Sequence, residues 1–79
     1  MRLSDLGEKE IINVTNGSRY GDLVNTELLF EEKTAKIRAI LVPEYRGRMF
    51  FSGVRDYIQM PWDCIRKIGE DIIIVETEL

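Results

Sequence analysis

Residues 23–43, LVNTELLFEEKTAKIRAILVP, are the most informative part of this chain because they predict two strands folded back on each other. Alternate residues of Leu23–Phe30 would share one face of a strand, namely Val24, Thr26, Leu28 and Phe30. The polar segment Glu31–Thr34 predicts a hairpin loop, and Ala35–Val42 predicts the return strand. That strand becomes apolar on both faces toward its end, which is typical of a sheet that curls over itself. We expect it to stop at Pro43, which has no backbone N–H to donate.

The flanking segments predict more short strands joined by turns. Glu10–Val14 is rich in β-branched residues, and Thr15–Ser18 contains Asn-Gly, the strongest short turn signal. After the central hairpin, Met49–Phe51 and Tyr57–Met60 predict a second hairpin. Pro61–Asp63 predicts a corner with a single helical turn, because proline fixes φ there.

The C-terminal segment predicts one last strand. Cys64–Ile68 is a short element, Gly69–Asp71 a turn, and Ile72–Val75 a continuous apolar strand. We expect Glu76–Leu79 to be a frayed tail. Turn signals about every 8–12 residues indicate an all-β fold. We predict a small closed or partly closed β-barrel of about five to six antiparallel strands, since closure would protect the Ile72–Val75 edge.

Composition sets the class of protein. The 79 residues allow a single domain, residues 1–79, and 44% hydrophobic with 32% charged residues is the balance of a globular domain. The net charge of −3 argues against non-specific nucleic-acid binding, which depends on neutralising phosphates.

Neither secretion nor membrane insertion is indicated. A single cysteine, Cys64, cannot form an internal disulfide, and Met1–Glu8 lacks the apolar run of a signal peptide. No segment approaches the roughly 20 apolar residues that span a bilayer. We therefore expect a cytoplasmic protein.

No catalytic centre can be recognised in the residues. The chain has no histidine and no Gly-rich phosphate loop. Its candidate carboxylates do not follow a metal-loop spacing; these are Asp5, Glu8, Glu10, Asp22, Glu70 and Asp71. A barrel of this size fills its interior with side chains. We expect no enzymatic activity, no cofactor and no metal.

Several pieces of the chain, in order, resemble one known family. They are Met1–Leu6, Lys9–Asn13 with Asn16-Gly17, Leu28–Phe30, Leu41–Glu44, Met60–Trp62 and Ile65–Asp71. This set resembles the PRC-barrel family, and within it the small single-domain branch labelled sporulation proteins in spore-forming Firmicutes.

The resemblance implies a β-barrel of about six strands, in line with the strand count, and no catalytic residues to carry over. Relatives occur as the cytoplasmic domain of the photosynthetic reaction-centre H subunit and as the C-terminal domain of a ribosome maturation factor. Both roles are protein-facing. The resemblance therefore implies a protein-interaction or adaptor module, associated with sporulation.

The expected contact surface is the basic and apolar hairpin Arg46–Tyr57. Three large apolar residues in succession cannot all face one side of a strand, so one should point outward unless it is covered. The candidate residues are Arg46, Arg48, Met49, Phe50, Phe51, Arg55 and Tyr57. The same residues would serve a homodimer. RNA or ribosome binding, in which stacking and phosphate contacts combine, is also left open by a basic and aromatic set: Arg46, Arg48, Arg55, Arg66, Lys67, Tyr45 and Tyr57.

Two further residues have competing interpretations. Cys64 lacks a histidine to activate it, and Asp63 beside it would raise its pKa, so a buried structural thiol is favoured over a nucleophile. Trp62 follows Pro61 between apolar strands, which favours a core plug over an exposed partner anchor. Its indole N–H should then meet a backbone acceptor.

Overall fold

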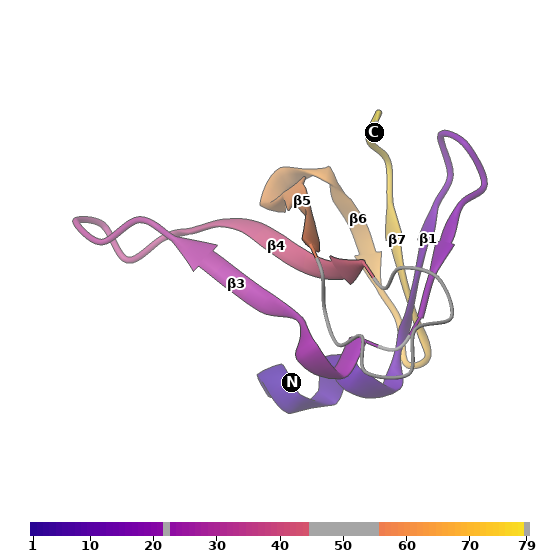
Figure 1. Ribbon diagram of the computed structural model, residues 1–79, viewed down its shortest axis with the longest axis horizontal. Coiled ribbons are helices and arrows are strands. Elements are labelled where there is room, and N and C mark those ends of the chain that lie inside the picture. Colours follow the sequence, from indigo (N-terminus) through magenta and orange to yellow (C-terminus); the bar gives the residue numbers. More distant parts are fainter. Residues whose placement is uncertain (22, 45–55, 79) are drawn as a thin grey trace.

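The computed structural model describes residues 1–21, 23–44 and 56–78. Its described residues contain seven strands and three short 3₁₀ helices (Figure 1). In chain order these are η1 Leu3–Glu8, β1 Glu10–Asn13, β2 Arg19–Tyr20, η2 Leu23–Asn25, β3 Glu27–Phe30, β4 Ile37–Glu44, β5 Asp56–Pro61, η3 Trp62–Cys64, β6 Ile65–Ile68 and β7 Ile72–Val75. The expectation of an all-β fold is confirmed.

Within the described residues the strands form two sheets and no closed barrel, and they number seven rather than the predicted five to six. One sheet has the order β2-β1-β7-β6 and the other the order β3-β4-β5, and no ladder joins them within the described residues. The prediction of purely antiparallel strands is also wrong, because β1 and β7 pair in parallel, with Ile11 opposite Ile73. The edges of β7 are protected by β1 on one side and β6 on the other, so its apolar run needs no barrel closure.

The core lies between the two sheets. Ile11, Val42, Met60 and Val75 each expose 0% of their surface, and the core cluster draws on both sheets and on η1 and η2. Burial alternates along β1 and β7, so that every second side chain points into this core. Such alternation is what stabilises a thin core in a chain of this length.

The hairpin predicted in residues 23–43 exists with different boundaries. The strand does not begin at Leu23, since the Thr26 N–H donates to the Leu23 carbonyl at 3.0 Å and closes a 3₁₀ turn. This turn buries Leu23 and leaves Val24 73% exposed, so the period-2 pattern is interrupted there. The β-preference of Leu-Val is therefore overruled by a turn that puts Leu23 in the core.

The return strand is displaced by two residues. Its loop is closed by bonds from the Glu31 N–H to the Lys36 carbonyl (2.8 Å) and from the Ala35 N–H to the Glu31 carbonyl (2.7 Å). β4 then runs from Ile37 through Pro43 to Glu44. Pro43 does not end it, because β3 pairs only as far as Leu41 and a missing N–H costs nothing on that unpaired side. As predicted, β4 is half-exposed at its start and buried on both faces toward its end.

Later elements confirm most local predictions. The strand expected at Tyr57–Met60 is β5, although its observed partner is β4. Met49–Phe51, the other half of the expected second hairpin, lies outside the described residues. The corner at Pro61–Asp63 is η3. The turn at Gly69–Asp71 is closed by the Gly69 N–H, which donates to the Ile72 carbonyl at 2.7 Å.

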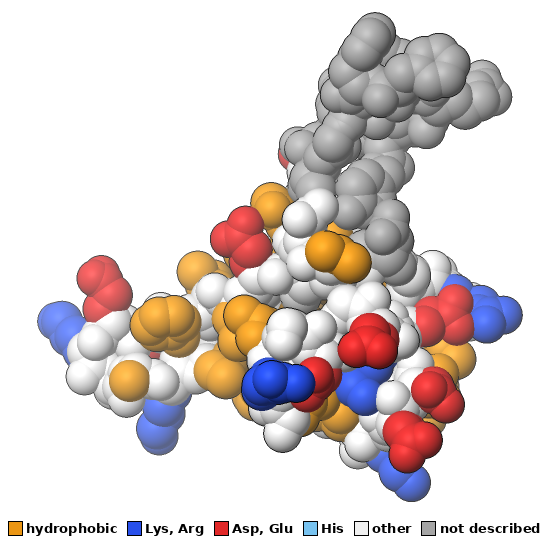
Figure 2. Space-filling view, turned by 90° about the horizontal axis from the view of Figure 1, so that it is seen from below, with side chains coloured by type: hydrophobic (Ala, Val, Ile, Leu, Met, Phe, Trp, Pro, Cys, Tyr) orange, Lys and Arg blue, Asp and Glu red, His pale blue; other side chains and the backbone are white. Residues whose placement is uncertain are grey.

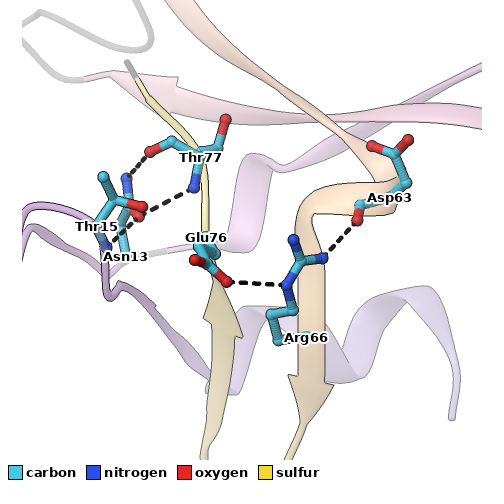
Figure 3. A network of polar contacts seen from close by, with 6 residues as sticks. All are labelled: Asn13, Thr15, Asp63, Arg66, Glu76 and Thr77. Atoms are coloured by element: carbon cyan, nitrogen blue, oxygen red, sulfur yellow. Dashed lines mark hydrogen bonds and ion pairs between the residues drawn. The ribbon is translucent and has the colours of Figure 1, made fainter.

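The C-terminal residues expected to fray are hydrogen-bonded at Glu76 and Thr77 (Figure 3). Asn13, fully buried, donates from Nδ2 to the Thr77 carbonyl at 2.9 Å and accepts at Oδ1 from the N–H groups of Thr15 (3.1 Å) and Thr77 (3.3 Å). The Glu76 carboxylate accepts from Arg66 Nε at 3.1 Å. One buried amide thus joins the β1–β2 turn to the end of β7.

Candidate binding groove

Most of the surface expected from the sequence lies outside the described residues, namely Arg46, Arg48, Met49, Phe50, Phe51 and Arg55. Tyr57 is described, on β5 opposite Pro43, and is 39% exposed. Its phenol O–H donates to Glu27 Oε2 at 2.9 Å, which links β5 to β3 across β4. Tyr57 therefore has a structural partner, and its role at an interface stays a prediction.

An apolar groove of about 170 Å³ opens between the two sheets, and sequence reasoning did not find it. We call it the apolar groove. One wall comes from Leu28 on β3 and from Ile37 and Ile40 on β4. The opposite wall comes from Ile65 and Ile68 on β6.

The N-terminal segment and η3 complete the groove. Met1, Leu3 and Leu6 line it from η1 and the residues before it, and Trp62 lines it from the corner after β5. Met1 is 70% exposed and Leu3 53%, so large apolar side chains stand open to solvent at its rim. Arg2 also contributes to the lining, with its guanidinium 3.9 Å from Asp5.

The β3–β4 hairpin extends beyond the apolar groove. Its end, residues 28–38, projects from the body in Figure 1, and hydrophobic side chains gather along it in Figure 2. We call this segment the arm. Leu28 pairs with Ile40 and Phe30 with Ile37, and directly opposed residues share a face. Ile37 and Ile40 line the groove, whereas Phe30, 58% exposed, lines a separate depression of about 300 Å³ on the arm together with Leu29 and Arg38.

One edge of the groove is an open strand. In the described residues β6 is the last strand of its sheet, and it pairs with β7 along one edge only. The Gly69 N–H donates to the Ile72 carbonyl, so these two residues are a hydrogen-bonded pair of the antiparallel β6–β7 ladder. Hydrogen-bonded and non-hydrogen-bonded pairs alternate along such a ladder, so the next hydrogen-bonded residue of β6 is Lys67. The N–H and C=O of Ile68 therefore point away from β7. Ile68 thus offers an apolar side chain, 41% exposed, in the groove and a backbone donor and acceptor at its edge.

The two residues with competing interpretations both belong to this region. Cys64 is 5% exposed, and burial raises the pKa of its thiol, so the prediction that the thiol is buried is confirmed. Trp62 is half-buried rather than a full core plug, since one side of it lines the groove. Across the described residues its indole N–H meets no backbone acceptor, contrary to the expectation.

A second depression is polar. Its volume is about 610 Å³, and it brings together four of the carboxylates singled out in the sequence, Asp5, Glu8, Glu70 and Asp71. Lys9 lies among them, but its Nζ donates to the carbonyl oxygens of Gly69 (3.0 Å) and Glu70 (2.6 Å). Lys9 thus fixes the β6–β7 turn to the start of β1. Among residues 1–21, 23–44 and 56–78, no three acidic or sulfur ligands are placed to hold a metal ion.

Sequence reasoning missed the groove for a definite reason. It placed Leu28 and Phe30 on one face that a barrel would turn inward, whereas in the structure Leu28 lines the groove and Phe30 lines a separate depression. The exposure of Phe30 follows from the length of the arm, which runs past the opposing sheet. Within the part of the chain that the structure describes, no helix is long and apolar enough to cross a membrane.

Comparisons with known proteins agree on one family. The model of the PRC-barrel domain matches residues 1–78. The chain is 38% identical over 80 residues to the uncharacterized protein YmxH of Bacillus subtilis (strain 168), covering 98% of this chain and 89% of that protein. It is 33% identical over 73 residues to the probable sporulation protein YlmC of the same strain, covering 92% of this chain and 88% of that protein.

Proposed function

Because the chain belongs to the PRC-barrel domain family, we propose that it is a non-enzymatic protein-interaction module whose binding site is the apolar groove. The observation that carries this proposal is the pairing of an apolar groove with an open strand edge at Ile68. Modules that bind extended peptides combine the same two features, since main-chain bonds supply affinity and adjoining apolar recesses supply specificity.

The lining favours a protein segment over a polar small molecule. Large aliphatic side chains dominate both walls, and their exposure at Met1 and Leu3 costs free energy that a partner's apolar residues would recover, at about 25 cal/mol per Å² buried. Exposed apolar surface gathered around a recess is what marks an interaction site on a small domain.

Sporulation is the proposed setting. The relative YlmC is named a probable sporulation protein, and 92% of this chain aligns with it. We extend that setting to this chain as part of the proposal, together with a cytoplasmic location.

RNA or ribosome binding is the alternative. Three of the arginines on which it rested, Arg46, Arg48 and Arg55, lie outside the described residues. Arg66, a fourth, is paired with Glu76 and bonded to the Asp63 carbonyl at 2.8 Å. The net charge of −3 disfavours phosphate binding. This alternative is therefore an outcome of the test rather than a second proposal.

The test is capture of partners by the tagged full-length chain from vegetative and sporulating cells of the native host, with and without nuclease. Ile68→Lys would block the groove, and Val14→Lys is the matched control, because Val14 is a 55% exposed β-branched residue in the β1–β2 turn. We expect a discrete protein that survives nuclease, is retained by Val14→Lys and is lost with Ile68→Lys. Retention by both variants, or ribosomal proteins that disappear on nuclease treatment, would contradict the proposal.

A further inference from the structure

The open edge of β6 and the apolar groove meet at Ile68. The backbone N–H and C=O of this residue point away from β7, and its side chain, 41% exposed, lines the groove. An extended chain laid antiparallel along this edge, the more stable of the two strand directions per residue, would exchange both hydrogen bonds with Ile68 through the residue directly opposite. The side chain of that opposite residue would point to the same side of the sheet, into the groove.

The size of the groove sets how many side chains can enter it. An apolar cavity of about 150 Å³ holds one molecule of benzene. The groove, at about 170 Å³, therefore has room for one aromatic or large aliphatic side chain. Its lining, which includes Ile40, Ile65 and Trp62, offers apolar contacts to such a side chain. We call the partner residue that places its side chain there the anchor.

The other face of β6 carries an unpaired positive charge. Lys67, the residue before Ile68, points away from the groove because successive side chains of a strand alternate, and it is not among the residues that line the groove. Lys67 is exposed and has no ion-pair partner among the described residues. Arg66 differs, since Glu76 accepts from its Nε at 3.1 Å. Lys67 is therefore the cation of this strand that is left for a partner.

The charge on Lys67 selects the residue next to the anchor. In an antiparallel strand whose anchor lies opposite Ile68, the residue after the anchor lies opposite Lys67 and on the same face as Lys67. Opposite charges in such cross-strand pairs stabilise a sheet, and like charges destabilise it. The residue before the anchor lies opposite Gly69, whose neighbour Glu70 would repel a carboxylate. An acidic residue is therefore favoured after the anchor and not before it.

We infer that the partner of the apolar groove is an extended peptide that adds to β6 as an antiparallel strand, with one large apolar anchor opposite Ile68 and an acidic residue opposite Lys67. This inference rests on the proposed function, since it takes the groove to be a protein-binding site. It names the conformation of the bound segment, the number of its buried side chains and the order of two of its residues.

The first test is an NMR titration of the isotope-labelled full chain with two synthetic peptides of equal composition. Acetyl-Thr-Thr-Thr-Leu-Glu-Thr-Thr-amide places Glu after the anchor, and acetyl-Thr-Thr-Glu-Leu-Thr-Thr-Thr-amide places it before. The first peptide should shift the amide resonances of Ile68 and Lys67, leave that of Val14 in place, and bind about 2- to 5-fold more tightly than the second at low salt. No shift at Ile68, or tighter binding of the second peptide, would overturn the inference.

Changes in the first peptide test the anchor without touching the fold of the protein. Alanine in place of its leucine should weaken binding about 10- to 100-fold, since one large apolar side chain is no longer buried. A methyl group on the backbone nitrogen of the leucine removes the donor to the Ile68 carbonyl and should weaken binding at least about threefold. Binding that is indifferent to both changes would mean that no strand is added to β6.

Reversal of the charge at position 67 tests the acidic preference. Lys67→Glu should bind the first peptide about 2- to 5-fold less tightly than the wild type, and should prefer a version of it with lysine in place of glutamate. Lys33→Glu is the matched control, because it changes the net charge equally but lies in the exposed loop of the arm (Figure 1). Equal effects of the two substitutions would contradict a pairing with Lys67.

These results separate the inference from the proposed function. A cellular partner that is lost with Ile68→Lys, together with no shift at Ile68 on adding either peptide, would refute the added strand and leave the interaction module intact. Peptide binding as predicted, with capture from cells unaffected by Ile68→Lys, would refute the proposed partner site and leave the strand-binding edge intact.

Discussion

Replacing Asn13 by alanine should destabilise the fold more than any other substitution of a polar side chain described above. The side chain is fully buried and makes three hydrogen bonds, at 2.9, 3.1 and 3.3 Å. A net contribution of about 0.5–1.5 kcal/mol per bond, with the longest bond at the weak end, gives a loss of about 2–4 kcal/mol. For a domain of this size that is a large part of the total stability, which is about 0.05–0.15 kcal/mol per residue.

The loss has two parts. Removing the amide leaves the backbone groups of Thr15 and Thr77 without their partner, and such groups cost free energy wherever water cannot reach them. It also releases the end of β7, since both bonds to Thr77 disappear together. Hydrogen exchange at the Thr77 amide should therefore accelerate more than exchange in β4, where no contact changes.

Urea unfolding followed by circular dichroism measures the free energy directly. Thr77→Ala is the first control, because Asn13 bonds the backbone of Thr77 and not its hydroxyl; it should cost less than about 0.5 kcal/mol. Asn16→Ala is the second, because its single bond to the Ser18 N–H is exposed; it should cost no more than about 1 kcal/mol. A loss below about 1 kcal/mol for Asn13→Ala, or equal losses for Asn13→Ala and Thr77→Ala, would refute the assignment.

Three other substitutions test the fold. Ala35, with φ of 62°, is the non-glycine residue with positive φ in the described part of the chain. Ala35→Gly should raise the free energy of unfolding in urea by about 0.5–1 kcal/mol, because the strain relieved exceeds the entropy cost of glycine. A lower free energy of unfolding would contradict this. Thr26 buries a hydroxyl that has no hydrogen-bond partner within the described residues, so Thr26→Val should stabilise the chain by about 1 kcal/mol in the same assay; destabilisation would mean that the hydroxyl is satisfied. Burial raises the pKa of the Cys64 thiol above that of an exposed thiol, so the unfolded chain ionises first, and stability, intact at lower pH, falls as the pH rises through the ordinary thiol pKa toward the folded one. The pH dependence should be shallower for Cys64→Ala, and parallel curves would contradict the shift.

Local signals in the sequence predicted the elements that local interactions determine. The Asn-Gly turn, the corner at Pro61–Asp63 and the apolar strand Ile72–Val75 each depend on a few adjacent residues, and each is observed. Asn16 and Gly17 share the turn, but only Gly17 takes a positive φ, of 77°. The burial of β4 toward its end was also predictable, because its sequence changes from alternating to continuous apolar residues.

Non-local pairing was the part that the sequence left undetermined. Nothing in Glu10–Asn13 or Ile72–Val75 distinguishes a parallel from an antiparallel partner, since both are short apolar strands. The boundary at Leu23 depended on a core contact, and the ordering of Thr77 depended on an amide 64 residues away. The division into two sheets, and with it the apolar groove, follows from these pairings. The groove could be found only once the sheets were placed.

The candidate site, too, could be predicted only in its local features. A two-residue period predicted one face for Leu28 and Phe30, but the register shifts between Leu29 and Phe30, and only Leu28 lines the groove. Leu3 and Ile68 carry no pattern that marks them as a surface. They become a site because η1 and β6 are brought to one recess.

The central claim is that the apolar groove binds protein, and a photoreactive amino acid placed in it tests that claim most directly. The residue would replace Ile68 in the groove and, in a parallel strain, Val14 in the β1–β2 turn, with irradiation of intact sporulating cells of the native host. The account predicts discrete protein adducts from position 68, whether with a second copy of the chain or with another protein, and none from position 14. Equal labelling at both positions, or no protein adduct at position 68, would contradict it.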